Sequence, residues 1–188
     1  MKKTEIVGYH RANLGKKEAR ELREQALVPC VLYGGEKQIH FAAPMYLFRS
    51  LIFTPDVYEV TLNIEGEIHK AILQDIQYHP VSDIILHADF LEIKDDKEIK
   101  VEVPVRFKGT AVGVTKGGKL VQKIRKIKVQ GLAANIPDYV DVPVADLDLG
   151  KSVKVGSLKV EGFKILNNAS LPIASVEIPR ALRSTLKS

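Results

Sequence analysis

The chain has 188 residues but only one cysteine, Cys30, and no tryptophan. A single cysteine excludes an intramolecular disulfide and a zinc site made of several cysteines, and it favours a reducing compartment. The sequence also lacks a run of about 18 apolar residues, so we predict no transmembrane helix. No apolar stretch follows the two lysines near the N-terminus, which argues against a secretory signal. We therefore expect a cytoplasmic protein without a membrane partner.

Sequence motifs typical of enzymes are absent as well. The chain has no phosphate-binding loop, no Gly-x-Gly-x-x-Gly motif and no Gly-x-Ser-x-Gly nucleophile elbow. Cys30 lies within an apolar run, where it is best interpreted as an unreactive core thiol. We accordingly expect no catalytic residue, no cofactor and no small-molecule substrate.

The sequence does contain enough apolar residues for a folded protein. They make up 45% of the chain and charged residues 27%, which excludes intrinsic disorder. At roughly 100 to 200 residues per domain, the length allows one large domain or two small ones. The net charge of +5 indicates an acidic partner.

The two halves of the chain differ in charge. Residues 1–93 carry 10 basic and 13 acidic side chains, a net charge of −3, whereas residues 94–188 carry 18 and 10, a net charge of +8. Two halves with net charges of opposite sign usually have different functions. We predict two closely joined domains, 1–93 and 94–180, followed by a basic tail, 181–188, that is disordered in isolation.

Hydrophobic periodicity predicts a mainly β chain with a few helices. In the first half we expect strands over 4–11, 28–33, 38–42, 57–64, 67–77 and 84–93, and helices over 16–27 and 44–53. In the second half, short strands between glycine and proline turns favour a C-terminal all-β domain, a small sandwich or barrel. These strands are expected near 101–107, 124–131, 139–144, 152–155 and 172–179, with a long loop or hairpin over 109–118.

The helix over 16–27 sorts its side chains by face. At about 100° per residue, three stripes are predicted. The apolar stripe contains Ala19, Leu22 and Ala26, the basic stripe Lys16, Arg20 and Arg23, and the acidic stripe Glu18, Glu21 and Glu24. We expect the apolar stripe to face the core.

A second polar cluster is expected on the strand over 84–93. Alternate residues of a strand share a face, so His87 and Asp89 point together, away from Phe90. They form a candidate metal-ligand pair, but no third ligand accompanies them. A polar strand face explains them better than a metal site does.

A constellation of polar residues indicates nucleic-acid binding. Its members are Arg11, the basic stripe, Tyr33, His87 and Asp89. Arginine forks match phosphate oxygens and guanine edges, and a helix that begins at Gly15 offers unpaired N–H groups to a phosphate. Asp89 can accept a hydrogen bond from a base amino group, so it indicates base reading. The alternative is a solvated amphipathic helix beside an ordinary core tyrosine.

Four motifs resemble a known family. They are Arg11-x-x-x-Gly15-Lys16-x-x-x-Arg20-x-Leu22-Arg23, Val28-Pro29-x-Val31-Leu32-Tyr33-Gly34, Gln74-Asp75-Ile76-Gln77-x-His79-Pro80 and Leu86-His87-x-Asp89-Phe90. In this order and spacing they resemble the bacterial large-subunit ribosomal protein that binds 5S rRNA, in its longer two-domain form, the general stress protein CTC type. Val101-Glu102-Val103-Pro104-Val105 and the glycine pattern over 109–118 extend the likeness into the second half.

The resemblance implies a fold, a partner and a site. The family's first domain is an N-terminal β-barrel with flanking helices, and it binds an irregular internal loop of 5S rRNA through a widened groove. Carried over by position, the RNA-binding residues are Arg11, Lys16, Arg20, Arg23, Tyr33, Gln74, His87 and Asp89. Strand alternation places Gln74 in phase with Ile72 and Ile76, so only the resemblance selects it. The implied partners are 5S rRNA, the large ribosomal subunit and its neighbouring ribosomal proteins.

Three positions depart from the family pattern. The family often has a small hydroxyl residue where Ala19 stands, and a basic residue where Glu21 and Tyr78 stand. One phosphate hydrogen bond is therefore expected to be missing, while Tyr78 can replace a phosphate contact by stacking. We expect a modest loss of salt-dependent affinity.

The second half carries the densest run of basic residues. Lys116, Lys119, Lys123, Arg125, Lys126 and Lys128 occur with no carboxylate between them. A solubilising surface explains this run as well as a second RNA surface does, and a neighbouring acidic surface is a further candidate partner.

Two other functions stay open on the sequence alone. One is a metal-dependent enzyme that uses His79, His87 and Asp89. The other is a free stress-response protein that acts by protein contacts through the second domain.

Overall fold

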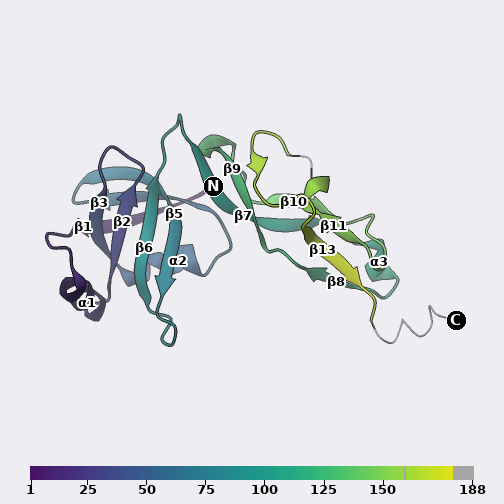
Figure 1. Ribbon diagram of the computed structural model, residues 1–188, viewed down its shortest axis with the longest axis horizontal. Helices are drawn as coiled ribbons and strands as arrows, with labels where there is room; N and C mark the ends of the chain where they lie inside the picture. The colour runs from purple at the N-terminus through teal and green to yellow at the C-terminus, as the bar shows by residue number, and fades with distance from the viewer. Residues whose placement is uncertain (159, 180–188) are drawn as a thin grey trace. The chain divides into compact units, whose positions relative to one another are not determined.

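The protein is built mainly of β-strands with a few short helices, as the sequence predicts (Figure 1). The computed structural model describes residues 1–158 and 160–179. The predicted basic tail, 181–188, lies outside the described residues.

The chain divides into two compact units. Unit 1 contains residues 1–99 together with 132–134, and unit 2 contains the described residues of 100–131, 135–158 and 160–179. The division falls within strand β7, Glu98–Lys108, shortly after the point where the charge changes sign in the sequence.

Unit 1 is a closed six-stranded barrel. Its strands are β1 (Lys2–His10), β2 (Leu27–Tyr33), β3 (Ile39–Pro44), β4 (Tyr58–Ile64), β5 (Glu67–Tyr78) and β6 (Ile85–Glu92). Around the barrel they follow the order β1-β3-β2-β6-β5-β4, with β1–β4 and β2–β6 parallel and the other neighbours antiparallel. A closed barrel has no unpaired edge strand, so its outer face is free to carry a site.

Three phenylalanines fill the barrel. Phe41, Phe48 and Phe90 are fully buried, and the centroid of the Phe90 ring lies 5.8 Å from that of Phe41 and 6.1 Å from that of Phe48. Phe48 comes from a 3-10 turn, Met45–Phe48, that continues into helix α2, Arg49–Ile52, where the sequence predicts one longer helix.

Helix α1, Lys16–Glu24, packs on β2 and is shorter than the helix predicted over 16–27. Ala26 has a φ of 57°, a left-handed conformation that a right-handed helix cannot contain, and the chain turns there into β2. Ala26 is therefore exposed and the prediction that it faces the core is wrong, whereas Ala19 and Leu22 are half-buried.

Strand β5 contains a β-bulge that breaks the predicted alternation. Its pairing with β6 shifts register between Leu73 and Asp75, so Gln74 is the extra residue. Ile76 packs against the core while Gln74 is exposed. The prediction that Gln74 and Ile76 share a face is wrong because it assumes an uninterrupted strand.

Unit 2 contains two small sheets. The four-stranded sheet has the order β10-β7-β9-β12, with β10 at Val140–Pro143, β9 at Lys126–Leu132 and β12 at Lys164–Ile165. The three-stranded sheet has the order β11-β13-β8, with β11 at Ser152–Lys154, β13 at Pro172–Glu177 and β8 at Lys119–Gln122. Short helical turns are α3 (Val112–Thr115), η2 (Ala133–Asn135) and η3 (Val155–Ser157).

Helix α3 lies where the sequence predicts a loop. Two glycines let it pack closely: a Cβ on Gly113 would lie 2.8 Å from the carbonyl carbon of Asp148, and one on Gly118 would lie 2.5 Å from Cγ1 of Val176. A one-turn helix is too short to show periodicity, so hydrophobic patterning does not detect it.

Replacing Phe90 by Ala should destabilise the barrel by about 3–5 kcal/mol, because it removes a buried ring and leaves a cavity. The matched control is Phe53→Ala, since the Phe53 side chain is 79% exposed. Urea unfolding of the full chain measures both changes. Equal losses of stability in the two variants would contradict this packing.

Candidate nucleic-acid interface

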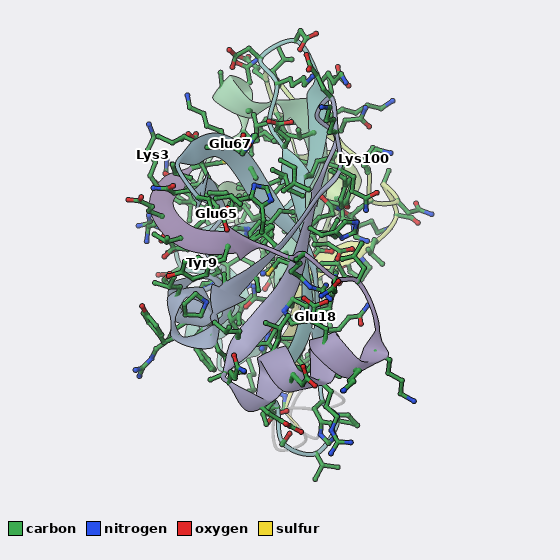
Figure 2. All side chains as sticks on the ribbon, turned by 90° about the vertical axis from the view of Figure 1, so that its left-hand side faces the viewer. Lys3, Tyr9, Glu18, Glu65, Glu67 and Lys100 are labelled. Atoms are coloured by element: carbon green, nitrogen blue, oxygen red, sulfur yellow. The ribbon has the colours of Figure 1, made fainter. Side chains whose placement is uncertain are left out.

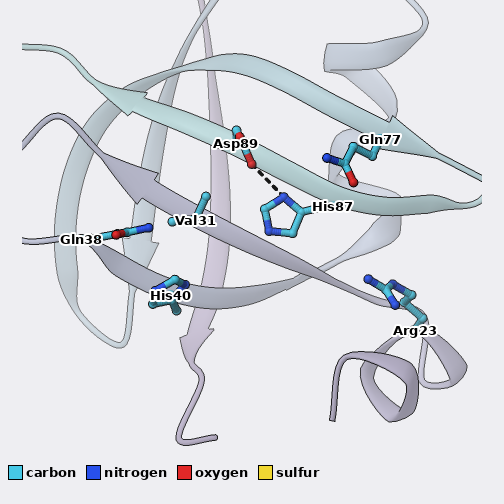
Figure 3. Close-up of a pocket in the computed structure, with 7 residues that line it drawn as sticks. All are labelled: Arg23, Val31, Gln38, His40, Gln77, His87 and Asp89. Atoms are coloured by element: carbon cyan, nitrogen blue, oxygen red, sulfur yellow. Dashed lines mark ion pairs between the residues drawn. The ribbon is translucent and has the colours of Figure 1, made fainter. Parts of the chain in front are cut away.

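An open pocket of about 390 Å³ lies on the outer face of the barrel (Figure 3). Helix α1 contributes Arg23 and β2 contributes Val31. Strand β5 contributes Gln77, and β6 contributes His87 and Asp89. Segments far apart in the sequence therefore place polar side chains around one hollow.

Cross-strand pairing sets the floor of this pocket. Val31 on β2 lies opposite His40 on β3 and, on its other side, opposite Asp89 on β6. Asp89 in turn lies opposite Asp75 on β5. Val31 is buried, so it forms an apolar floor between the ionisable groups of His40 on one side and Asp89 on the other.

His87 and Asp89 lie on one face of β6, as predicted, and form an ion pair. His87 Nδ1 lies 2.7 Å from Asp89 Oδ1, and the side chains are 29% and 32% exposed. A carboxylate at this distance fixes the orientation of the imidazole ring. The pair therefore presents a fixed ring and an anionic acceptor to the pocket.

Helix α1 brings one of its predicted cations, Arg23, to the pocket. Arg23 Nε donates a hydrogen bond to the Leu86 carbonyl at 3.0 Å, which joins the helix to β6. Lys16 and Arg20 are exposed, and Arg20 Nε lies 3.0 Å from Glu24 Oε1. Exposed pairs one helical turn apart contribute only about 0.3–0.5 kcal/mol, so Arg20 can exchange Glu24 for a stronger anion.

Arg11 lies deeper than the other predicted cations. Its backbone N–H donates to the His40 carbonyl at 3.1 Å, and its side chain is only 8% exposed. Nη2 of Arg11 lies 3.8 Å from Oε2 of Glu18. Figure 2 shows Glu18 on the side of α1 that faces the strands. Glu18 is therefore the acidic partner of Arg11, one of the cations of the predicted site.

Burial and nearby charges shift the pKa values of two residues of β2, Tyr33 and Cys30. Burial raises the pKa of the Tyr33 hydroxyl, and the negative charges of Asp89 and Asp75 raise it further, so Tyr33 stays a hydrogen-bond donor. Burial likewise raises the pKa of the Cys30 thiol well above its usual value. Arg11 lowers that pKa and Asp89 raises it, but both effects are smaller than burial.

Sequence reasoning does not single out three polar residues of the pocket: Gln38, His40 and Gln77 (Figure 3). Gln77 pairs with His87 across β5 and β6, and its place in the motif over 74–80 is a signal that could have identified it. Gln38 and His40 belong to no motif, and only the pairing of β3 with β2 brings them here.

His79 does not join His87 and Asp89. Its Nδ1 accepts hydrogen bonds from the backbone N–H groups of Val81 at 3.4 Å and Ser82 at 3.3 Å, in the turn after β5. Among residues 1–158 and 160–179, no group of three or more histidine, cysteine or acidic side chains could hold a metal ion.

The basic run of unit 2 separates into two groups. Three of its members have carboxylate partners: Lys116–Asp148 at 2.9 Å, Lys123–Glu177 at 2.8 Å and Lys128–Glu102 at 3.6 Å. The hydrogen bond from Lys116 lowers the pKa of Asp148. The other three, Lys119, Arg125 and Lys126, are exposed. The run contains no carboxylate in the sequence, but the fold brings carboxylates from other segments to three of its six cations.

Comparison with known proteins decides the family. Residues 6–90 match the model of the Ribosomal L25p family, and residues 98–180 match that of the Ribosomal protein TL5, C-terminal domain. The chain is 49% identical to large ribosomal subunit protein bL25 of Cytophaga hutchinsonii over 97% of this chain and 95% of the relative. The protein of the same name from Amoebophilus asiaticus is 48% identical over 98% of this chain and 94% of the relative. The chain belongs to the ribosomal L25p family.

Membership in the L25p family confirms the resemblance seen in the sequence motifs. L25p proteins are structural components of the ribosome rather than enzymes, which agrees with the expectation of no catalytic residue. Within the described residues, no helix combines the length and apolar character needed to cross a membrane.

Cys30 of this L25p protein should resist thiol reagents in the native state. Its raised pKa keeps the thiol protonated at pH 8, and burial denies access to the reagent. Labelling by a chromogenic disulfide at pH 8 should therefore be slow, and it should become complete in denaturant. Rapid labelling of the native chain would contradict the placement of Cys30 in the barrel core.

Proposed function

We propose that this protein is a structural component of the large ribosomal subunit, in the cytoplasm, and that it binds 5S rRNA through unit 1. One observation carries the proposal: Arg23 of α1 lines a pocket that contains the His87–Asp89 pair on the outer face of the barrel. Relatives that cover nearly the whole chain are named large ribosomal subunit protein bL25.

Phosphates are held by the cations of α1. Lys16 and Arg20 are exposed on the helix, and Arg23 lines the pocket. Guanidinium groups match phosphate oxygens with two parallel hydrogen bonds, and each neutralised phosphate releases counterions. This part of the contact is independent of sequence and weakens as salt rises.

Base edges are read by the pocket itself. Asp89 accepts a hydrogen bond from a base amino group, and the His87 ring is held beside it. Gln74, exposed at the bulge of β5, and Tyr33 on β2 are not among the residues that line the pocket, and they add further donors or acceptors to the proposed contact. The major groove of regular A-form RNA is too deep and narrow for side chains to read, so the proposed partner is an irregular region in which that groove is widened.

The departures at Ala19, Glu21 and Tyr78 weaken this contact only modestly. Glu21 Oε1 lies 4.0 Å from Lys17 Nζ, an exposed pair on α1 that is distinct from the Arg20–Glu24 pair. Tyr78 is 41% exposed at the end of β5, where its ring can stack on a base.

Replacing Arg20 or His87 by Ala should weaken binding of the full chain to 5S rRNA by about 1–3 kcal/mol each. Arg20→Ala should also flatten the dependence of affinity on salt, because one phosphate contact is lost. The control is Lys17→Ala, whose side chain is 93% exposed on the same helix. A titration over a range of salt measures all three, and unchanged affinity in both site variants would refute the assignment.

We further propose that unit 2 contacts ribosomal RNA or an acidic neighbouring ribosomal protein through Lys119, Arg125 and Lys126, the exposed cations of the run for which residues 1–158 and 160–179 supply no carboxylate partner. Reversing the charge of Lys119, Arg125 and Lys126 together should release the chain from large subunits at lower salt than the unsubstituted chain. The matched control reverses Lys116, Lys123 and Lys128, the members engaged in ion pairs. Sucrose-gradient fractionation at increasing salt is the measurement, and equal retention of both triple variants would exclude this surface.

A further inference from the structure

An arginine of unit 2 stacks on an exposed tyrosine. The guanidinium carbon of Arg106, on β7, lies 5.0 Å from the centroid of the Tyr139 ring, which comes just before β10. Neither residue lines the pocket of unit 1 or belongs to the basic run over 116–128. Arg106 is exposed, and Tyr139 is 45% exposed although the guanidinium lies over its ring. The surface of unit 2 therefore presents an aromatic ring together with a cation.

Strand pairing places two further cations next to this stack. The Val105 N–H donates to the Arg125 carbonyl at 3.0 Å, so Arg125 lies across from the residue that precedes Arg106. Lys126 follows as the first residue of β9. Arg125 and Lys126 are exposed members of the surface already proposed for unit 2. The aromatic stack therefore adjoins the cations of that proposed contact.

Arg106 has a ring rather than a carboxylate as its partner. Asp141 is its neighbour in the parallel pairing of β7 with β10, yet within residues 1–158 and 160–179 no carboxylate forms an ion pair with Arg106. A guanidinium that stacks on a ring keeps its in-plane N–H groups, which match phosphate oxygens. The pair therefore offers a flat aromatic surface and a set of hydrogen-bond donors side by side.

The ring decides between RNA and an acidic protein as the partner of this surface. The face of an aromatic ring is negative, so it does not attract a carboxylate, and a contact with acidic residues needs only cations. Nucleobases stack on tyrosine rings and on guanidinium planes while neighbouring cations hold the phosphates. Such stacking requires a base that is not already stacked within a duplex. An unpaired nucleotide therefore fits the surface best.

We infer that Arg106 and Tyr139 form a stacking site for an unpaired nucleotide of ribosomal RNA, with Arg125 and Lys126 beside the adjoining phosphates. The inference rests on the proposed contact of unit 2, and it decides between the two partners named there. Every base has an aromatic face, so the site accepts an unpaired nucleotide of any sequence.

The test is a titration of the full chain with a labelled uridylate oligonucleotide, a single strand whose bases are free to stack on protein. Tyr139→Leu should weaken binding about tenfold because the stacking surface is lost, whereas Tyr139→Phe should bind within about twofold of the unsubstituted chain. The matched control is Tyr46→Leu, since Tyr46 is a 75% exposed tyrosine of unit 1. Equal affinities of Tyr139→Leu and Tyr46→Leu would overturn the inference.

Salt and strandedness separate stacking from charge. Tyr139→Leu should leave the slope of log affinity against log salt unchanged, while Arg106→Gln should reduce it by about 0.7, the value for one phosphate of a single strand. On a regular RNA duplex of the same length, Tyr139→Leu should have no effect because the bases are stacked on one another. A loss on the duplex as large as that on the single strand would assign the ring a structural role only and overturn the inference.

A measurement on the unsubstituted chain does not depend on how the variants fold. With the uridylate oligonucleotide bound at saturation, intermolecular nuclear Overhauser effects should join the ring protons of Tyr139 to base protons. Their absence from Tyr139 at saturation would overturn the stacking site.

Ribosome association distinguishes this inference from the proposed contact of unit 2. If charge reversal of Lys119, Arg125 and Lys126 releases the chain from large subunits at lower salt, while Tyr139→Leu changes neither release nor uridylate binding, the contact stands and the stacking site is overturned. If the charge reversal has no effect on release while Tyr139→Leu weakens uridylate binding about tenfold, the proposed contact through those cations fails and the stacking site is supported.

Discussion

The parallel pairing of β2 with β6 is the constraint on which the candidate site depends. It places Val31 opposite Asp89 and, one residue away, Cys30 opposite Ala88, so polar and core side chains alternate in step on both strands. A slip of one residue would turn His87 and Asp89 into the core. Barrel closure and the packing of Phe90 against Phe41 and Phe48 resist such a slip. The same register of β2 and β6 therefore determines both the core packing and the outer polar face.

The basic character of the site is local rather than global. Residues 1–93 have a net charge of −3, and their useful cations are concentrated on α1 and beside it. Position then matters more than number, because the helix holds Arg23 at the pocket and presents Lys16 and Arg20 to solvent. Two contacts fix α1 to the barrel, the Arg23–Leu86 hydrogen bond at its end and the Arg11–Glu18 pair at its start. In the proposed RNA contact, Asp89 inside the pocket adds selectivity for hydrogen-bond donors over a purely electrostatic attraction.

The sequence predicts much of this fold because its signals are local. Alternation identifies the outward face of His87 and Asp89, and periodicity identifies α1. Three features depend on information that local patterns lack. The left-handed conformation of Ala26 ends α1 early, the bulge at Gln74 changes the facing of β5, and strand pairing alone brings His40 beside Val31. Glu18 shows the same limit: helical angles place it on an acidic stripe, but only the fold shows that Arg11 lies opposite it.

The most direct test of the central claim is a map of backbone amide shifts in the isotope-labelled full chain, with and without 5S rRNA. The account predicts that the largest changes fall on α1 and on β5 and β6 around Gln77 and His87. It predicts small changes on the outward residues of β1 and β4, such as Val7 and Asn63, which pair with each other away from the pocket. Changes centred on β1 and β4, with α1 and β6 unaffected, would contradict it.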